Sequence, residues 1–154
     1  MDIIKNPHPS EVLPLFRALH FFHVSVAPQM YHAEGEDSEY ITHLEEAYAK
    51  GATIYAVEGG WGLVAYLLAL PEQRAQDALR RGHNRMRIDH LYVAPTHRGK
   101  ALGRRLVAAM EADMHRLGIP DWIVTWHASN PEAGLAYERL GGTASLVISA
   151  KANV

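Results

Sequence analysis

Pro95-Thr96-His97-Arg98-Gly99-Lys100-Ala101-Leu102-Gly103-Arg104-Arg105 is the stretch that decides how the chain folds. It lies between a segment at 86–94 that predicts a strand and an apolar stripe at 102–117 that predicts a helix. Its glycines leave the main chain uncrowded, so a ligand can approach the backbone N–H groups closely. Four bases accompany the turn: Arg98, Lys100, Arg104 and Arg105.

Two interpretations of this turn are open from the residues alone. Bases at a helix N-terminus oppose the helix dipole, and a bound anion such as a diphosphate would compensate them. The alternative is a tight strand-to-helix turn with an exposed basic first helical turn. The turn is not a Walker A loop, because Lys100 does not follow the second glycine, and it lacks the G-x-G-x-x-G fingerprint of dinucleotide-binding folds.

Outward from this turn, apolar periodicity and turn-forming residues predict a mixture of helices and strands. Helices are predicted at 9–23 with Ser10 as N-cap, at 38–50, at 102–117 ended by Gly118, and at 131–140 with Asn130 as N-cap. Strands are predicted at 53–57, 61–70, 86–94, 122–126 and 146–150, and a loop or short surface helix at 71–84. An early hairpin and a later strand–helix–strand crossover predict an α/β or α+β sheet with antiparallel and parallel neighbours.

Length and composition limit the class of protein. The 154 residues predict one domain over 1–154, and 48% hydrophobic with 21% charged residues is an ordinary soluble mixture. The lack of cysteine excludes disulfides and thiolate catalysis. The N-terminus does not resemble a signal peptide, and the longest apolar run, Leu63–Leu70, is much shorter than the about twenty residues that cross a bilayer. We therefore expect a cytoplasmic protein with no membrane partner.

The charges are unevenly distributed along the chain. The net charge of −2 argues against a nucleic-acid partner. Residues 1–46 carry eight acids against two bases, whereas residues 74–116 carry ten bases against four acids. One region therefore favours a cation and the other an anion, with solvated surface as the alternative explanation.

Two motifs resemble those of the GCN5-related N-acetyltransferases, the GNAT family. Arg98-Gly99-Lys100-Ala101-Leu102-Gly103 is similar to the acyl-CoA loop [RQ]-x-x-G-x-[GA], with Ala101 where glycine is usual. The segment Asn130–Gly141 is similar to the second signature, N-x-x-A-x-x-[FA]-Y-x-x-x-G, and departs only in the following Gly142, which is usually aromatic. The resemblance covers nearly the whole chain. It implies a mixed, mostly antiparallel sheet with a central splay, flanked by helices.

The resemblance also implies a reaction. Members of the family move an acetyl group from acetyl-CoA to an amine, which attacks the thioester directly in a ternary complex. The main chain entering the loop and the loop itself are implied to bind acetyl-CoA. By position these residues are Leu91, Tyr92, Val93, Arg98, Gly99, Lys100, Ala101, Leu102, Gly103, Arg104 and Asn130.

Two catalytic roles follow from the same resemblance. Tyr137 is implied to protonate the departing thiolate, because its ordinary pKa of about 10 lies above that of a thiol. The alternative is a tyrosine that only packs one end of a helix. Asp89 is a candidate base acting through water, and His90 and His127 are rivals, since histidine ionises near neutral pH. A mechanism with no dedicated base is also open. Strand alternation predicts that Asp89 and His90 point to opposite faces.

The acceptor is expected to be an amine. In the family, the segment between the first two helices covers the acceptor site, which here implicates Tyr31, Glu34 and Asp37, together with His90 and His127. The acids of this segment favour a cationic small molecule or peptide amine, with a solvated loop as the alternative. None of the ten histidines forms a His-x-x-x-His pair, so no metal is expected.

We therefore expect an acetyl-CoA-dependent N-acetyltransferase. One alternative is a non-catalytic acyl-CoA-binding regulatory module, and another is an unrelated domain that uses the turn to bind a different nucleotide. A homodimer through the C-terminal strands is common in the family.

Overall fold

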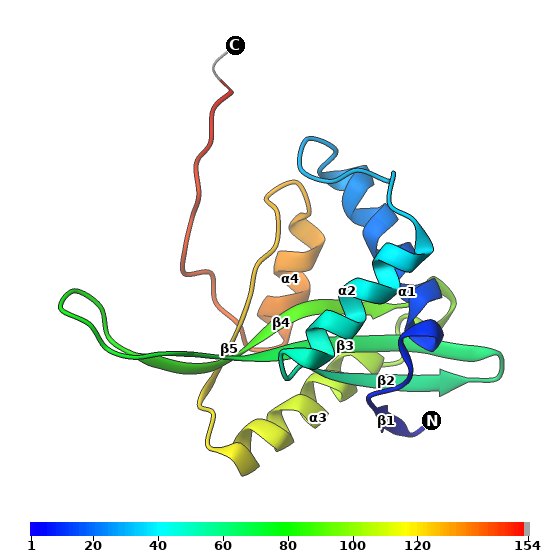
Figure 1. Ribbon diagram of the computed structural model, residues 1–154, viewed down its shortest axis with the longest axis horizontal. Helices are drawn as coiled ribbons and strands as arrows, with labels where there is room; N and C mark the ends of the chain where they lie inside the picture. The colour runs from blue at the N-terminus through cyan, green and yellow to red at the C-terminus, as the bar shows by residue number, and fades with distance from the viewer. Residues whose placement is uncertain (153–154) are drawn as a thin grey trace.

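A five-stranded sheet organises residues 1–152, the part of the chain that the computed structural model describes (Figure 1). Helices cover both of its faces, as expected for an α+β fold. The strands are β1 (Ile3–Lys5), β2 (Thr53–Gly59), β3 (Gly62–Arg74), β4 (His83–Val93) and β5 (Asp121–Val124). The helices are α1 (Pro9–Val26), α2 (Asp37–Ala49), the short 3-10 turn η1 (Pro95–His97), α3 (Leu102–Leu117) and α4 (Pro131–Arg139).

The strands lie in the order β1-β2-β3-β4-β5. All neighbours are antiparallel except β4 and β5, which are parallel. The β4–β5 pairing covers only Arg85–Ile88 opposite Asp121–Val124, whereas β4 continues to Val93. The sheet therefore opens after Ile88, which confirms the splay that the sequence resemblance implied.

Each face of the sheet has its own apolar core. On one face α3 contributes Leu102, Leu106, Met110 and Met114 of the predicted stripe, whereas its fifth predicted member, Leu117, is exposed at the last turn. The helix ends at Gly118, whose φ of +71° suits glycine. On the other face α1 and α2 pack Phe16, Tyr40 and Leu44 against β2 and β3. No helix within residues 1–152 has the length and hydropathy needed to cross a membrane.

Two helix starts differ from the sequence prediction. Helix α1 begins at Pro9 with His8, not Ser10, as its N-cap, because the His8 ring accepts a hydrogen bond from the Ser10 N–H. The Glu11 carboxylate accepts the His8 N–H and completes a capping box. Helix α2 begins at Asp37, one residue earlier than predicted, with Glu36 as its N-cap.

The prediction of a loop or short helix at 71–84 is confirmed for residues 75–82, which form a loop, and is wrong for both ends of the segment. Strands β3 and β4 extend into these ends as a two-stranded hairpin, paired as far as Arg74 opposite His83. Polar cross-strand contacts replace an apolar core here, including the ion pair of Arg85 with Glu72 at 3.1 Å. The hairpin projects beyond the rest of the sheet (Figure 1).

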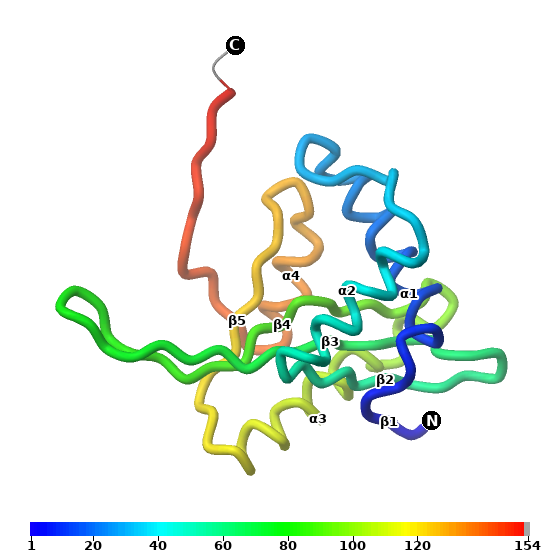
Figure 2. Tube along the Cα trace, viewed as in Figure 1, coloured from blue at the N-terminus to red at the C-terminus, as the bar shows by residue number. Residues whose placement is uncertain are grey.

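The strand predicted at 146–150 is also absent. The chain runs away from the body after α4 (Figure 2), and Leu146, Val147 and Ile148 are 81%, 85% and 79% exposed. The apolar composition favours a strand, but a strand also needs a neighbour. No strand of residues 1–152 pairs with this segment. Strand β1 was not predicted, because three residues carry too little periodicity.

Tryptophans hold α4 against the end of β5. The Trp126 ring lies over Gly134, so closely that a Cβ on Gly134 would come within 2.6 Å of two ring atoms. The Trp122 ring approaches Tyr137, with 6.4 Å between ring centroids, and a Cβ on Gly142 would lie 3.0 Å from it. Glycine at 134 is therefore required by packing rather than by backbone conformation.

We predict that Gly134→Ala destabilises the protein. Alanine is the better helix former by about 1 kcal/mol, but the clash with Trp126 outweighs this gain, and we expect a net loss of about 1–3 kcal/mol. Chemical denaturation followed by circular dichroism measures it. In a Trp126→Ala background the same substitution should become stabilising, because the clash is gone. A gain in stability in the wild-type background would contradict the packing argument.

Candidate functional site

The turn before α3 presents main-chain N–H groups to solvent. Gly99 and Ala101 have φ angles of +76° and +58°, in the left-handed region. The N–H groups of Gly99, Lys100 and Ala101 donate to no backbone carbonyl within residues 1–152. The first N–H groups of a helix also have no partner in the helix itself. The turn therefore has the donors that a phosphate group requires.

The space above these donors is kept open by small residues. A Cβ on Gly103 would meet only the Val93 side chain, at 4.0 Å, and a Cβ on Gly99 would meet nothing within 4 Å. Packing therefore does not require glycine at position 103, and the space beside it is open to a ligand. Ala101, the departure from the family pattern, adopts a left-handed conformation that costs an alanine about 1–2 kcal/mol.

The four bases of the turn are not equivalent. Arg98 donates from Nε to the Val93 carbonyl at 3.0 Å, and its guanidinium lies 5.7 Å from the centre of the Tyr92 ring. Lys100 and Arg104 are exposed. Arg105 donates to the Met1 carbonyl and so lies on the other side of α3. Three of the four bases are therefore available to an anion.

The end of β4 is open toward β5. Leu91, Tyr92 and Val93 pair with β3 on one side, but have no β5 residue opposite them on the other. Their main-chain groups on that side can pair with the amides of an extended ligand, as another strand would. Asn130 accepts a hydrogen bond from the Ala133 N–H, as predicted for the N-cap of α4.

A β-bulge in β4 changes the direction of its side chains. Leu68 pairs with His90 and Ala69 with Ile88, so Asp89 is the extra residue. Arg87 Nε donates to Asp89 Oδ1 at 2.7 Å, and the His90 ring stacks on Phe16 of α1. Both side chains therefore lie on the face covered by α1 and α2. The prediction that Asp89 and His90 point to opposite faces is wrong, because alternation fails at a bulge.

Sequence reasoning missed Arg87 as a partner of Asp89. Arg87 also approaches Glu72 on β3, with 3.8 Å between Nη1 and Oε1. The hydrogen bond from Arg87 to Asp89 raises the pKa of the guanidinium. The spacing of two residues on one strand would have indicated this pair, since such residues share a face.

His90 lies in a stack of rings from three elements. The Phe16 centroid is 4.7 Å from that of His90, and the His43 centroid is 5.7 Å away. Burial is the main cause that lowers the pKa of His90 to about 3, and His43, His23 and His20 lower it further. The residue nevertheless keeps partial solvent exposure. His90 is therefore neutral at physiological pH.

The hydrogen bond between His90 and Tyr66 fixes the imidazole tautomer. Tyr66 Oη lies 3.0 Å from His90 Nδ1, and Tyr66 is fully buried with its pKa held well above the usual value by burial. If Nδ1 carried the proton, the Tyr66 hydroxyl hydrogen would be buried without an acceptor, at a cost of about 1–3 kcal/mol. Tyr66 therefore donates to Nδ1, and the His90 proton is on Nε2.

Tyr137 is a protonated phenol within a partly buried site. Burial raises its pKa to about 12, while its side chain keeps partial exposure. The hydroxyl has no hydrogen-bond partner among residues 1–152. It can therefore donate a proton to a ligand but does not ionise near neutral pH.

His127 connects two loops. Its Nδ1 accepts the Ser129 N–H at 3.0 Å, and its Nε2 lies 3.2 Å from Gln29 Nε2 in the loop after α1. The Ser129 hydroxyl donates to the Val26 carbonyl and strengthens the same connection. These contacts place the loop after α1 beside the loop before α4.

The acids near the start of α2 are largely used within the chain. Glu36 and Glu39 form the capping box, and Asp37 pairs with Arg17 at 2.9 Å. Glu34 is exposed, and Tyr31 stacks on His23 with 5.5 Å between ring centroids. Burial, followed by the nearby His20, lowers the pKa of His23.

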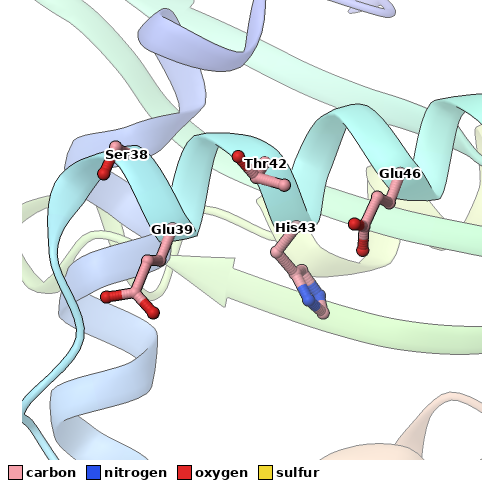
Figure 3. A pocket seen from close by; sticks show the side chains of 5 residues that line it. All are labelled: Ser38, Glu39, Thr42, His43 and Glu46. Atoms are coloured by element: carbon pink, nitrogen blue, oxygen red, sulfur yellow. The ribbon is translucent and has the colours of Figure 1, made fainter.

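One open hollow lies along α2, on the side from which His43 stacks on His90 of β4. Figure 3 shows that Ser38, Glu39, Thr42, His43 and Glu46 line it, and that Glu39, His43 and Glu46 point to the same side. A single helix supplies all five residues, so the hollow is not an enclosed cavity. Within residues 1–152 no three side chains of metal-binding type converge.

A family model described as "Acetyltransferase (GNAT) family" matches residues 18–142. No curated protein sequence matches the chain significantly. Among solved structures, a tetramutant of the BH1408 protein from Bacillus halodurans has a TM-score of 0.86 at 17% identity, covering 99% of this chain and 100% of that one.

Two further similar structures are those of acetyltransferases. A ribosomal-protein-alanine N-acetyltransferase from Brucella melitensis biovar Abortus 2308 has a TM-score of 0.73 at 17% identity and covers 99% of this chain and 100% of its own. An aminoglycoside N-acetyltransferase in complex with CoA has a TM-score of 0.69 at 14% identity, with 97% of this chain and 93% of that chain covered. At these identities the likeness shows the fold.

We predict that the buried imidazole of His90 makes stability depend on pH. Free histidine has a pKa of about 6.5, so between about pH 6.5 and 4 the unfolded chain binds a proton that folded His90, with its pKa of about 3, does not. Stability should therefore fall with decreasing pH, by up to about 1.4 kcal/mol per pH unit for this proton. Urea denaturation at several pH values measures the slope.

The control is a second histidine. His90→Gln should flatten this slope, whereas substitution of the exposed His115 by glutamine should leave it unchanged. An equal slope in wild type and His90→Gln would show that His90 is not buried in its neutral form.

Proposed function

Because the chain belongs to the GNAT acetyltransferase family, we propose that it transfers an acetyl group from acetyl-CoA to a primary amine. The observation that carries the proposal is the turn before α3, where unpaired N–H groups, two glycines and three available bases lie at a helix N-terminus. This arrangement suits the diphosphate of CoA. A similar solved structure is a complex with CoA, which supports the same assignment.

The splay between β4 and β5 would hold the rest of the molecule. Main-chain groups of Leu91, Tyr92 and Val93 lack a neighbour on the β5 side and are free to pair with the pantetheine amides. Main-chain N–H groups of the same segment would polarise the thioester carbonyl. Asn130 caps α4 beside this opening and would lie near the pantetheine.

In the proposed reaction the neutral amine attacks the carbonyl carbon of the thioester. The new C–N bond forms as the C–S bond breaks, and the thiolate takes a proton from Tyr137. A phenol whose pKa is raised to about 12 is fully protonated at neutral pH and remains available for this step. The attacking nitrogen loses its proton through a water molecule to Asp89, which lies on the α1 and α2 face of β4, and Tyr137 regains a proton from solvent.

The acceptor would approach from the side of α1 and α2. Tyr31, Glu34, Asp37 and His127 border this side, and the acids favour a cationic amine. Because Asp37 pairs with Arg17, Glu34 is the carboxylate most available to an ammonium group. Thiol release from acetyl-CoA across a panel of cationic, neutral and acidic amines tests the proposed function. Binding of acetyl-CoA without thiol release with any amine would instead support a non-catalytic acyl-CoA-binding module.

We predict that Gly103→Asp weakens acetyl-CoA binding at least tenfold, about 1.4 kcal/mol. The carboxylate would occupy the open space above the α3 N-terminus and repel the diphosphate. Isothermal titration calorimetry measures the Kd. Gly103→Ala is the matched control, because its Cβ meets only Val93 at 4.0 Å, and it should have a smaller effect. Unchanged affinity in Gly103→Asp would place the diphosphate elsewhere.

We predict that Tyr137→Phe lowers kcat about 100-fold while the Kd for acetyl-CoA is unchanged, because general-acid catalysis typically contributes this much. Tyr48→Phe is the matched control. Its hydroxyl is also part-buried, its pKa is likewise raised to about 12, and it donates to the Pro7 carbonyl away from the opening. Full activity in Tyr137→Phe would remove Tyr137 from the mechanism, and loss of folding by circular dichroism would assign it a packing role.

A further inference from the structure

His90 and Asp89 present two different hydrogen-bonding groups on one face of β4. The bulge places both side chains on the α1 and α2 side of the strand. Asp89 offers a carboxylate, of which Oδ1 is bonded to Arg87. His90 offers an Nε2–H donor, because its Nδ1 receives the hydroxyl hydrogen of Tyr66. A carboxylate and a donor on consecutive residues form a two-point recognition element.

The donor of His90 is fixed rather than adjustable. Tyr66 is fully buried, so its hydroxyl cannot turn to another partner or to bulk water. Phe16 and His43 restrict rotation of the imidazole ring by stacking on it. No side chain or carbonyl among residues 1–152 accepts from His90 Nε2, and the residue keeps partial exposure. A ligand oxygen is therefore the partner that this donor lacks.

We propose that His90 is not a base but a hydrogen-bond donor to an oxygen of the acceptor, and that the acceptor carries this oxygen on the carbon adjacent to the one that bears its amine. The inference rests on the proposed acetyl transfer. With the amine at Asp89, the neighbouring oxygen is at His90. Both a hydroxyl, as in an amino sugar or amino alcohol, and a carbonyl, as in a peptide N-terminus, have this chemistry.

Matched pairs of acceptors test the specificity. Ethanolamine is compared with propylamine, 2-aminocyclohexanol with cyclohexylamine, and glycinamide with propylamine, so that amines with and without the adjacent oxygen are measured side by side. We expect kcat/KM to be at least tenfold higher for the member that carries the oxygen. A larger kcat/KM for the hydroxyl-bearing amines would indicate an amino sugar or amino alcohol, and a larger value for glycinamide would indicate a peptide N-terminus.

Two substitutions at His90 test whether its Nε2–H donor causes the preference for oxygen-bearing amines. Asparagine keeps an acceptor for the Tyr66 hydroxyl, and glutamine keeps a donor close to the position of Nε2. His90→Asn should abolish the preference by lowering kcat/KM only for the oxygen-bearing amine, and His90→Gln should keep part of it. The KM for acetyl-CoA should be unchanged in both. An equal loss for both members of a pair would overturn the proposal and assign His90 a structural role.

The tautomer can be measured without activity. In ¹⁵N-labelled protein, the NMR chemical shifts of the His90 imidazole should show a proton on Nε2 between pH 6 and 8. In Tyr66→Phe the proton should no longer be confined to Nε2, because the hydroxyl that donates to Nδ1 is gone. A proton on Nδ1, or an acidic limb in the pH profile of kcat/KM that disappears in His90→Gln, would overturn the proposal. Failure of every amine to release thiol would overturn the proposed function together with this inference. Activity without the oxygen preference would overturn the inference alone.

Discussion

The main chain of β4 loses one of its two neighbours after Ile88, and the candidate site depends on that loss. A strand in the middle of a sheet uses its N–H and C=O groups on both sides, and none remains for a ligand. Here five residues of β4 continue past the last β5 pair, bordered by β3 alone. Helices on both faces keep this half-paired strand in place, so the opening is part of a rigid sheet rather than a frayed end.

The surrounding elements meet at this opening. Helix α3 begins beside the end of β4 and presents its N-terminus, and α4 is held over the end of β5 by Trp122 and Trp126. From the other side, His127 and Ser129 connect to Gln29 and Val26, which brings the loop after α1 beside the loop before α4. In the proposed function, phosphate binding, proton donation and acceptor recognition would fall to three separate elements around one gap.

Local sequence patterns predicted the parts of the fold that depend on local physics. The stripe of α3, the left-handed end at Gly118 and the Asn130 cap each need only neighbouring residues, and all three are confirmed. Three other features depend on strand register or on contacts between distant segments. They are the bulge at Asp89, the hydrogen bond between Tyr66 and His90, and the contact of His127 with Gln29, which is 98 residues away in the sequence. No periodicity encodes them. The strand prediction at 146–150 is wrong because apolar residues favour a strand locally, whereas a strand also needs a neighbouring strand to pair with.

The contact between Trp126 and Gly134 also couples two distant properties of the molecule. Gly134 and Tyr137 are three residues apart, so they lie on the same side of α4, almost one turn from each other. Because α4 is short, a displacement at one position moves the whole helix. Any group larger than hydrogen at position 134 would push α4 away from the Trp126 indole. In the proposed reaction Tyr137 is the proton donor, so the placement of its hydroxyl would depend on the absence of one methyl group at Gly134. A substitution at position 134 would then change turnover as well as stability, although Gly134 itself has no proposed contact with acetyl-CoA or the amine.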